Sequence, residues 1–200
     1  MLSLLSVNAS LDITLVAQER DKWCYAAVAV SIAKYYDEKS DWAQCMLASE
    51  NLSDVEKKTS KNYCCDNPED EDCNTEGFIY NIDTQQGALV TTKNFGQWIK
   101  GPAEALPIYV EIRSGRPVIA LHRYKIQVDP DNVVELGHFT VISKYDHMWQ
   151  AELMLYIQDP WDKLGFKDNS ISYEKFKTYW AYDGIWTYTY FTKSSKQAKV

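Results

Sequence analysis

The first half of the chain carries its apolar residues in patterns typical of helices. Every position from 24 to 30 is apolar or small, and this run predicts one helix over residues 23–38 that is deeply buried near its start. A second helix is expected over residues 42–51, with Ser40 and Asp41 as its candidate N-terminal caps. The first half is therefore expected to be mainly helical.

A third helical pattern covers residues 102–115, where Gly115 is expected to end the helix and Pro117 lies just beyond it. Residues 60–77 show little periodicity and hold three cysteines. We expect this stretch to form an irregular loop that is cross-linked or exposed.

The second half of the chain changes character. Short segments rich in β-branched and aromatic residues are separated by turn signals, a pattern typical of strands in an antiparallel sheet. One or two helical turns are expected over residues 173–180, between the last two strands. The four expected strands are residues 117–124, 138–145, 152–157 and 184–192.

This order of elements predicts the α+β class, with a cleft between a helical and a sheet-rich lobe. We expect a single domain over residues 1–200, with a helical lobe over 18–110 and a β-sheet lobe over 111–193. The boundary should fall near residues 100–115, without a flexible linker.

Composition and charge argue against some classes of binding partner. The 200 residues are 46% hydrophobic and 24% charged, an ordinary globular balance. The net charge of −7 comes without a basic stripe, which argues against nucleic acid as a partner. No apolar run reaches the roughly 20 residues of a membrane span. The N-terminal stretch lacks the basic region of a signal peptide, so we do not expect it to be one. Export by another route, or after cleavage of a longer precursor, remains an alternative.

Cys24 is the first candidate for chemistry, because it stands where the first helix is expected to begin. A cysteine attacks as thiolate, and with a free pKa of about 8.5 little thiolate exists at neutral pH. The positive end of a helix and a nearby imidazolium both favour the anion. We expect the small side chains of Ala26, Ala27 and Ala29 to let this helix end pack tightly against a sheet.

A histidine is the expected base, and the chain has only three: His122, His138 and His147. His138 follows a glycine at the front of an expected strand, and Asp159 ends the next one. If these strands pair, both side chains reach the same edge, and the acid can orient the imidazole and stabilise its charged form. His122 is the alternative base.

Gln18 completes this set of residues. Its side-chain amide could donate a hydrogen bond to the oxyanion that forms when a thiolate attacks a carbonyl, with the backbone N–H of Cys24 as the second donor. Asp146 and Asp162 are alternative third members of a triad, although each is an ordinary loop acid by sequence.

The pattern resembles the papain-like cysteine peptidases. The resemblance rests on Gln-x5-Cys with Trp23 before the cysteine and small residues after it, then Gly-His on a strand, then Asp-Pro-Trp. It spans roughly residues 18–190 and is most similar to a compact bacterial branch, which includes bacteriocin-leader peptidase domains of exporters and effector proteases of plant pathogens. The segment "GRPVIAL" at residues 115–121 also resembles a strand of that branch.

The resemblance implies a papain-like fold and a protein or peptide substrate, with no cofactor and no metal. It implies that Cys24 is the nucleophile, His138 the base, Asp159 the orienting acid and Gln18 the oxyanion donor. Three features depart from the branch: Tyr25 stands where tryptophan is common, an Asp takes the third position in place of Asn, and the insert over residues 45–77 is long and cysteine-rich. No transporter segments follow, which weakens the exporter interpretation.

The other four cysteines are Cys45, Cys64, Cys65 and Cys73. Because a bridge between adjacent cysteines is strained, we expect Cys64 and Cys65 each to bond one of the other two, in either arrangement. Two bridges indicate an oxidising compartment and favour a secreted or extracytoplasmic protein. Four reduced thiols in a cytoplasmic protein, or a zinc site, are the alternatives.

These observations predict a cysteine peptidase, such as a secreted bacterial effector or toxin. The same triad would serve a papain-like deamidase or acyltransferase, because the first half-reaction is shared. A catalytically silent binding module is the alternative from another class. The sequence indicates neither the cleavage specificity nor the oligomeric state.

Overall fold

The computed structural model describes residues 6–52, 60, 62–130, 132–148, 151–161, 169–178 and 183–195. The chain forms two compact units, here called the sheet unit and the helical unit. The sheet unit comprises residues 1–12, 96–159 and 166–191, and the helical unit comprises residues 13–95, 160–165 and 192–200.

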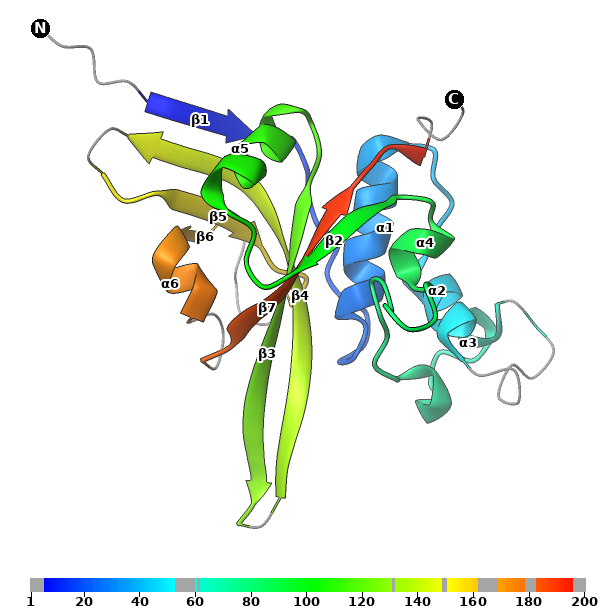
Figure 1. Cartoon of the computed structure of the whole chain (residues 1–200). Coiled ribbons are helices and arrows are strands. Elements are labelled where there is room, and N and C mark those ends of the chain that lie inside the picture. The colour runs from blue at the N-terminus through cyan, green and yellow to red at the C-terminus, as the bar shows by residue number, and fades with distance from the viewer. Residues whose placement is uncertain are drawn as a thin grey trace, which may run out of the picture. The chain divides into compact units, whose positions relative to one another are not determined.

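One curled antiparallel sheet builds the sheet unit (Figure 1). Its strand order is β2-β7-β3-β4-β5-β6, and β1 pairs with β4 beyond the end of β3. The strands in the described part of the chain are β1 (Ser6–Ser10), β2 (Phe95–Lys100), β3 (Val118–Asp129), β4 (Asn132–Met148), β5 (Met154–Gln158), β6 (Asn169–Ser172) and β7 (Ile185–Thr192).

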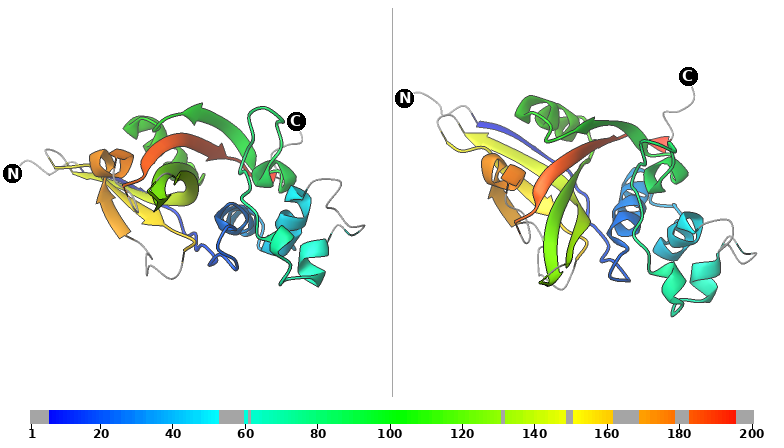
Figure 2. Two further views of the ribbon diagram at one scale, coloured as in Figure 1. Left: turned by 90° about the horizontal axis from the view of Figure 1, so that it is seen from below. Right: turned by 60° about the horizontal axis from the view of Figure 1, so that its bottom comes forward.

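Two helices lie against this sheet. Helix α5 (Ala105–Arg113) packs on β1, β3 and β4, and the shorter α6 (Tyr173–Thr178) lies beside β6 (Figure 2). Gly115 has a φ of +74°, a conformation that favours glycine, and it follows the end of α5 as the sequence predicted. A buried cluster between helices and sheet includes Ile108, Ile142 and Trp186.

The four predicted strands are present as β3, β4, β5 and β7, and the predicted α+β class is confirmed. Strands β1, β2 and β6 were not predicted. The sequences of β1 and β6, "SVNAS" and "NSIS", are short and mostly polar, so neither shows the pattern of a half-buried strand.

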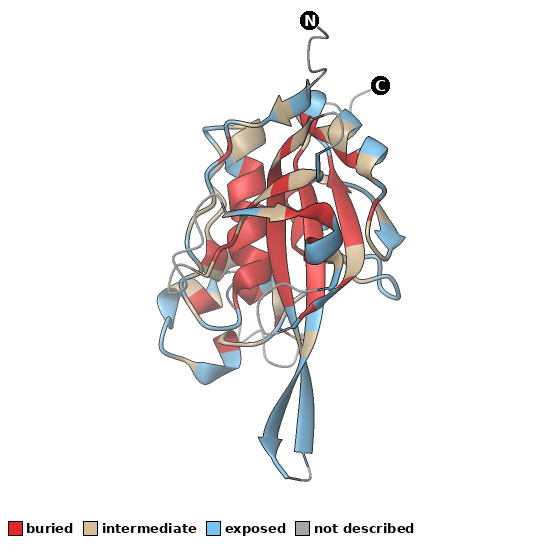
Figure 3. Cartoon of the chain, turned by 90° about the vertical axis from the view of Figure 1, so that its left-hand side faces the viewer, coloured by how far each residue is buried: buried red, intermediate tan, exposed pale blue. Residues whose placement is uncertain are grey.

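Strands β3 and β4 extend further than predicted. Beyond the sheet they continue as a two-stranded ribbon whose side chains are mostly exposed (Figures 1 and 3). The prediction ended one strand at residue 124 and began the next at 138, but pairing continues to Asp129 and Asn132. The strand pattern does reach this far, because Tyr124, Ile126 and Val128 alternate with Lys125, Gln127 and Asp129, so the predicted end at residue 124 was too early.

The helical unit is built around α1 (Cys24–Tyr36), which contacts α2 (Gln44–Asn51) and α4 (Ala88–Thr91). All residues from 24 to 33 are buried, which confirms the predicted buried start (Figure 3). The predicted caps of the second helix were wrong. Helix α2 begins after Ala43, and no side chain caps it. Its first residue, Gln44, is 2% exposed, and its side chain is hydrogen-bonded to the backbone of Ala17 and Glu19.

Two disulfides cross-link the region that the sequence predicted to be irregular. They join Cys45 to Cys65 and Cys64 to Cys73. Within it lie α3 (Tyr63–Asp66) and the 3-10 turn η1 (Glu71–Cys73). The prediction that the adjacent cysteines bond different partners is confirmed, and one of its two arrangements is selected. The alternatives of a zinc site and of four reduced thiols are therefore wrong for this structure.

A buried histidine lies in the centre of the sheet. His122 on β3 is 1% exposed and faces His138 across the β3–β4 pair. Its Nε2–H donates to the carbonyl oxygen of Phe176 at 2.9 Å, because a carbonyl can only accept. Burial is the main cause that lowers the pKa of His122 to about 4, so the ring is neutral at neutral pH.

The buried neutral ring of His122 predicts a loss of stability in acid. The folded state holds its pKa near about 4, below the usual 6.5, so the unfolded chain binds more protons between these values. The contribution of His122 is complete above pH 6.5 and falls by about 1.4 kcal/mol per pH unit toward pH 4. Urea unfolding of the wild type and His122→Gln at neutral pH and near pH 4.5 measures it. The stability advantage of the wild type should shrink in acid, and an unchanged difference would contradict the assignment.

Candidate active site

Cys24 is the first residue of α1 and carries the one thiol of the chain. All five cysteines are among the described residues, and the other four form disulfides. The first turn of α1 holds no acidic side chain, and Lys34 lies in its last turn. The N–H groups at a helix start lack intrahelical acceptors and carry the positive end of the macrodipole, so Cys24 lies at the positive end of α1.

Gln18 lies in the loop before this helix, and both of its amide protons are engaged. Nε2 donates to the carbonyl oxygens of Arg20 at 2.9 Å and Asp21 at 2.8 Å. Two carbonyl acceptors require the nitrogen on this side, which fixes the amide orientation. Oε1 is buried, and no described residue bonds to it. Gln18 can therefore donate to an oxyanion only by exchanging one of these loop carbonyls for it.

The side chain of Gln44 is hydrogen-bonded to the residues on either side of Gln18. Its Oε1 accepts from the backbone N–H of Glu19 at 3.0 Å, and its Nε2 donates to the carbonyl of Ala17 at 2.7 Å. The residues on both sides of Gln18 are thus bonded to one buried amide on α2. Sequence analysis missed Gln44, because a glutamine in a short helix gives no signal of a long-range contact.

Two more bonds fix the backbone at this point. The N–H of Gln18 donates to the carbonyl of Pro160 at 2.8 Å, and the N–H of Val16 donates to Ser31 Oγ at 2.9 Å. The hydroxyl of Ser31 donates in turn to Ala27 one turn earlier in α1, at 2.7 Å. The segment before Cys24 is therefore hydrogen-bonded to α1, the helix that begins with Cys24.

The cross-linked segment, residues 45–73, is hydrogen-bonded to Arg20 in the loop before Cys24. Its guanidinium donates to the carbonyls of Pro68 and Asp70 and to the carboxylate of Glu71 at 2.8 Å. The Glu71 side chain is 82% exposed, so the ion pair itself adds little stability. The backbone contacts are what join the loop to the segment that the disulfides close.

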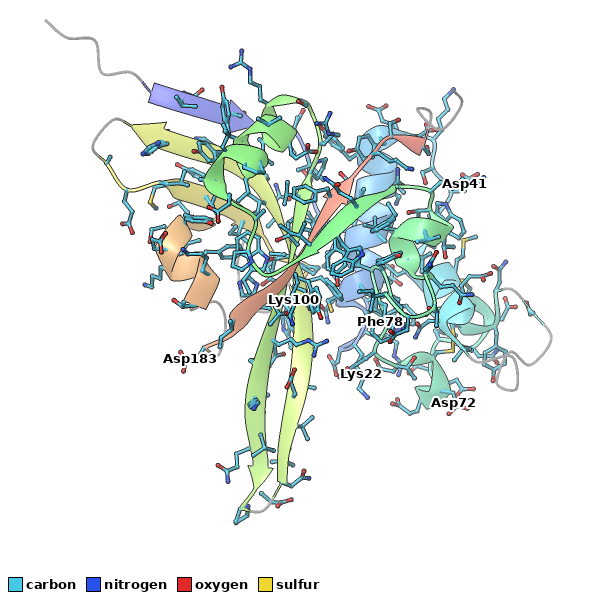
Figure 4. The ribbon with its side chains drawn as sticks, viewed as in Figure 1. Lys22, Asp41, Asp72, Phe78, Lys100 and Asp183 are labelled. Carbon is cyan, nitrogen blue, oxygen red and sulfur yellow. A yellow bond between two sulfur atoms is a disulfide. The ribbon has the colours of Figure 1, made fainter. Side chains whose placement is uncertain are left out.

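Trp23, directly before Cys24, is hydrogen-bonded to the same cross-linked segment. Its Nε1–H donates to the carbonyl of Cys73 at 2.7 Å in a buried contact, and the N–H of Lys22 donates to Asn74 Oδ1. Figure 4 labels Lys22 in the loop and Asp72 in the segment, with the disulfide sulfurs in yellow. The disulfides thus brace the loop that leads to Cys24.

Tyr25 follows Cys24 and is 1% exposed. Its ring lies against Gly77 so closely that a Cβ at Gly77 would stand 2.4 Å from a ring carbon. Burial, and then the charge of Cys24, raise the pKa of the Tyr25 hydroxyl, so it stays neutral. The aromatic residue at this position therefore serves packing, and Gly77 is required by close approach.

In the sheet unit, His138 and Asp159 form a buried pair. His138 Nε2 lies 2.7 Å from Asp159 Oδ1, and the side chains are 7% and 0% exposed. Strands β4 and β5 pair from Val141 opposite Gln158, and Asp159 follows directly. The predicted strand pairing is thus present, and it brings the two side chains together. Because the carboxylate accepts, Nε2 carries the proton in the neutral ring and Nδ1 carries the lone pair.

The other candidates lie elsewhere. His147 is on β4 opposite Val7, and Asp146 is on β4 with Lys144 Nζ 3.9 Å from its carboxylate. Asp162 lies outside the described residues. Of the four proposed site residues, Gln18 and Cys24 therefore belong to the helical unit, and His138 and Asp159 to the sheet unit.

Neither a protein-family model nor a curated protein matches the chain. Among solved structures, the chain is similar to xylellain, a cysteine protease from Xylella fastidiosa. The TM-score is 0.50 and the identity 12%, over 94% of this chain and 86% of that chain. At this identity, the similarity shows a shared fold.

Removing the Gln44 amide should loosen the Gln18 loop. In Gln44→Leu the N–H of Glu19 loses its acceptor, so its hydrogen exchange should accelerate about tenfold or more, and stability should fall by about 1–3 kcal/mol. Tyr36→Phe is the matched control, because it removes a 2.8 Å hydrogen bond to Thr192 near the other end of α1. Unchanged exchange at Glu19 in Gln44→Leu would show that Gln44 does not hold the loop.

Proposed function

We propose that this chain is a papain-like cysteine peptidase that hydrolyses peptide bonds through Cys24, His138 and Asp159. The observation that carries the proposal is the buried 2.7 Å contact between His138 and Asp159, in a chain whose one thiol opens a buried helix. The shared fold with a cysteine protease supports it. The proposal requires Cys24 to reach Nδ1 of His138.

The tautomer of His138 sets the order of the proposed proton transfers. Nδ1 takes the proton of the Cys24 thiol, and Asp159 holds the ring and stabilises the imidazolium. The sulfur attacks the peptide carbonyl, and the C–N bond breaks as His138 protonates the leaving amine. His138 then deprotonates a water molecule, which attacks the thioester, releases the acid and restores the thiol.

The oxyanion of each tetrahedral intermediate needs donors. The backbone N–H of Cys24 at the start of α1 supplies one. Gln18 supplies the second when its amide exchanges the carbonyl of Arg20 or Asp21 for the substrate oxygen. The bonds from Gln44 and Pro160 keep the Gln18 backbone in place during that exchange.

The two disulfides favour an oxidising, extracytoplasmic location and therefore an external protein or peptide as substrate. In the part of the chain that the structure describes, no helix has the length and apolarity to span a bilayer. A role as a secreted effector or toxin fits this location and extends the proposal.

Hydrolysis of β-casein, an unfolded protein, tests the proposal, with new chain ends identified by mass spectrometry. Cys24→Ser should abolish cleavage, and His138→Ala should lower kcat/KM by about 10²–10⁴-fold. Asp159→Asn should retain more activity than Asp159→Ala, because the Asn carbonyl still accepts from Nε2–H and keeps the ring oriented.

The products separate the proposal from its alternatives. Conversion of glutamine to glutamate without new chain ends would favour a deamidase. Joining of the acyl group to an added amine without hydrolysis would favour a transferase. Cleavage that persists in Cys24→Ser would refute the thiol mechanism, and a wild type without activity on casein would favour a binding module.

A further inference from the structure

The two edges of β4 are unequally covered. On one edge β3 pairs with β4 from Asn132 to Ile142. On the other edge β5 pairs with it only from Val141 to Asp146. Among the described residues, no strand pairs with this second edge from Asn132 to Thr140. Its backbone N–H and C=O groups form a strand-length template.

This edge is also exposed and lacks the usual protection. Residues 132–135 and Gly137 are exposed, and Leu136 is half-buried. Natural proteins blunt such edges with proline, lysine or a bulge. Residues 132–137 contain no proline and no lysine, and Glu135 is their only charged residue. An open strand edge of this kind can accept an extended chain as an added strand.

The outer edge of β3 is different. Strand β7 covers β3 only as far as Arg123, so the edge beyond is also without a paired strand in the described residues. However, Lys125 lies on this stretch, and the register shifts between Gln127 and Asp129 as in a β-bulge. Both features oppose strand addition. The ribbon thus protects one edge and leaves the other open.

We propose that residues Asn132–Gly137 of β4 bind the substrate chain as an added strand and lead it to His138. The proposal rests on the proposed peptidase function and names its substrate class, an extended polypeptide. Only a chain with its own N–H and C=O ladder matches a strand edge, and this edge runs directly into His138, the next residue of β4. Six residues of strand cover about 20 Å, so about six substrate residues on one side of the scissile bond would pair.

The side chains indicate which substrates fit best. Leu136 and Val134 lie opposite Tyr124 and Ile126 in the pairing register, so these four apolar side chains share one face of the ribbon. A third strand would place every second substrate side chain on that face. β-branched or aromatic residues at alternate substrate positions should therefore bind best.

Substrate length provides the first test. A peptide of about fourteen residues around a cleavage site found in β-casein is shortened stepwise from each end. Truncation on one side should lower kcat/KM progressively over about six residues, by roughly tenfold or more in total. Truncation on the other side should have a smaller and shorter-ranged effect. Efficient cleavage that does not depend on length would overturn the inference and leave the peptidase proposal intact.

A shortened ribbon provides the second test. Replacing residues 126–134 by Asn-Gly joins Lys125 to Glu135, which are already paired, through a two-residue hairpin turn. This variant keeps Glu135–Gly137, so it should cleave the fourteen-residue peptide about as slowly as the peptide that lacks the three outermost paired residues, and its rate on that shorter peptide should equal that of the wild type. The matched control is Lys125→Ala with Gln127→Ala on β3, which should keep the preference for long peptides. Equal loss on both peptides would overturn the inference.

N-methylation of alternate substrate residues identifies the pairing itself. In an added strand, successive N–H groups point to opposite sides, so methylating one alternate set should slow cleavage and methylating the other should not. Equal effects of the two sets would overturn strand addition. If the wild type cleaves no peptide of any length, both the inference and the proposed function fall.

Discussion

A hydrogen bond of 2.7 Å between two buried side chains, His138 and Asp159, is the contact on which the proposed chemistry depends. A carboxylate without solvent is costly unless a donor satisfies it, so the pair stabilises its own geometry. The pairing of β4 with β5 supplies the two positions, since it places residue 159 at the strand end beside His138. The contact also sets the tautomer, which leaves proton transfer to Nδ1. Removing either partner would leave the other buried with one contact fewer.

In the helical unit, hydrogen bonds from neighbouring elements hold the loop before Cys24. The loop from Gln18 to Trp23 forms hydrogen bonds within itself, and neighbouring elements also bond to it. Gln44 brackets Gln18, while the indole of Trp23 bonds to the carbonyl of Cys73. The two disulfides cross-link residues 45–73, which include Cys73 and directly follow Gln44. The bridges of four cysteines therefore stabilise the segment that holds the loop before Cys24, the fifth cysteine.

The sequence predicted those features that depend on local pattern. The apolar run located the buried helix that begins at Cys24, and β-branched segments located four strands. The strain of a bond between adjacent cysteines predicted that Cys64 and Cys65 have different partners. The strand order also predicted that His138 meets Asp159. These predictions depend on periodicity, on adjacent residues or on consecutive strands, which a sequence displays directly.

The features that the sequence analysis missed have different causes. Gln44 acts on residues 17–19, about 25 positions away, and nothing local distinguishes it from any other helical glutamine. Both protons of the Gln18 amide go to carbonyls of its own loop, a geometry that the motif Gln-x5-Cys does not specify. The extension of β3 and β4 is a different case, because Tyr124, Ile126 and Val128 continue the alternation of apolar and polar positions past residue 124, so the sequence does carry this signal.

The proposed function depends most on one claim, that the imidazolium of His138 stabilises Cys24 as a thiolate. Alkylation by iodoacetamide between pH 5 and 9, mapped to Cys24 by mass spectrometry, tests it most directly, with His138→Ala as the comparison. The account predicts fast modification of wild-type Cys24 near pH 6 and loss of that advantage in His138→Ala. A Cys24 that is inert, or that reacts like an ordinary thiol whether or not His138 is present, would contradict the account.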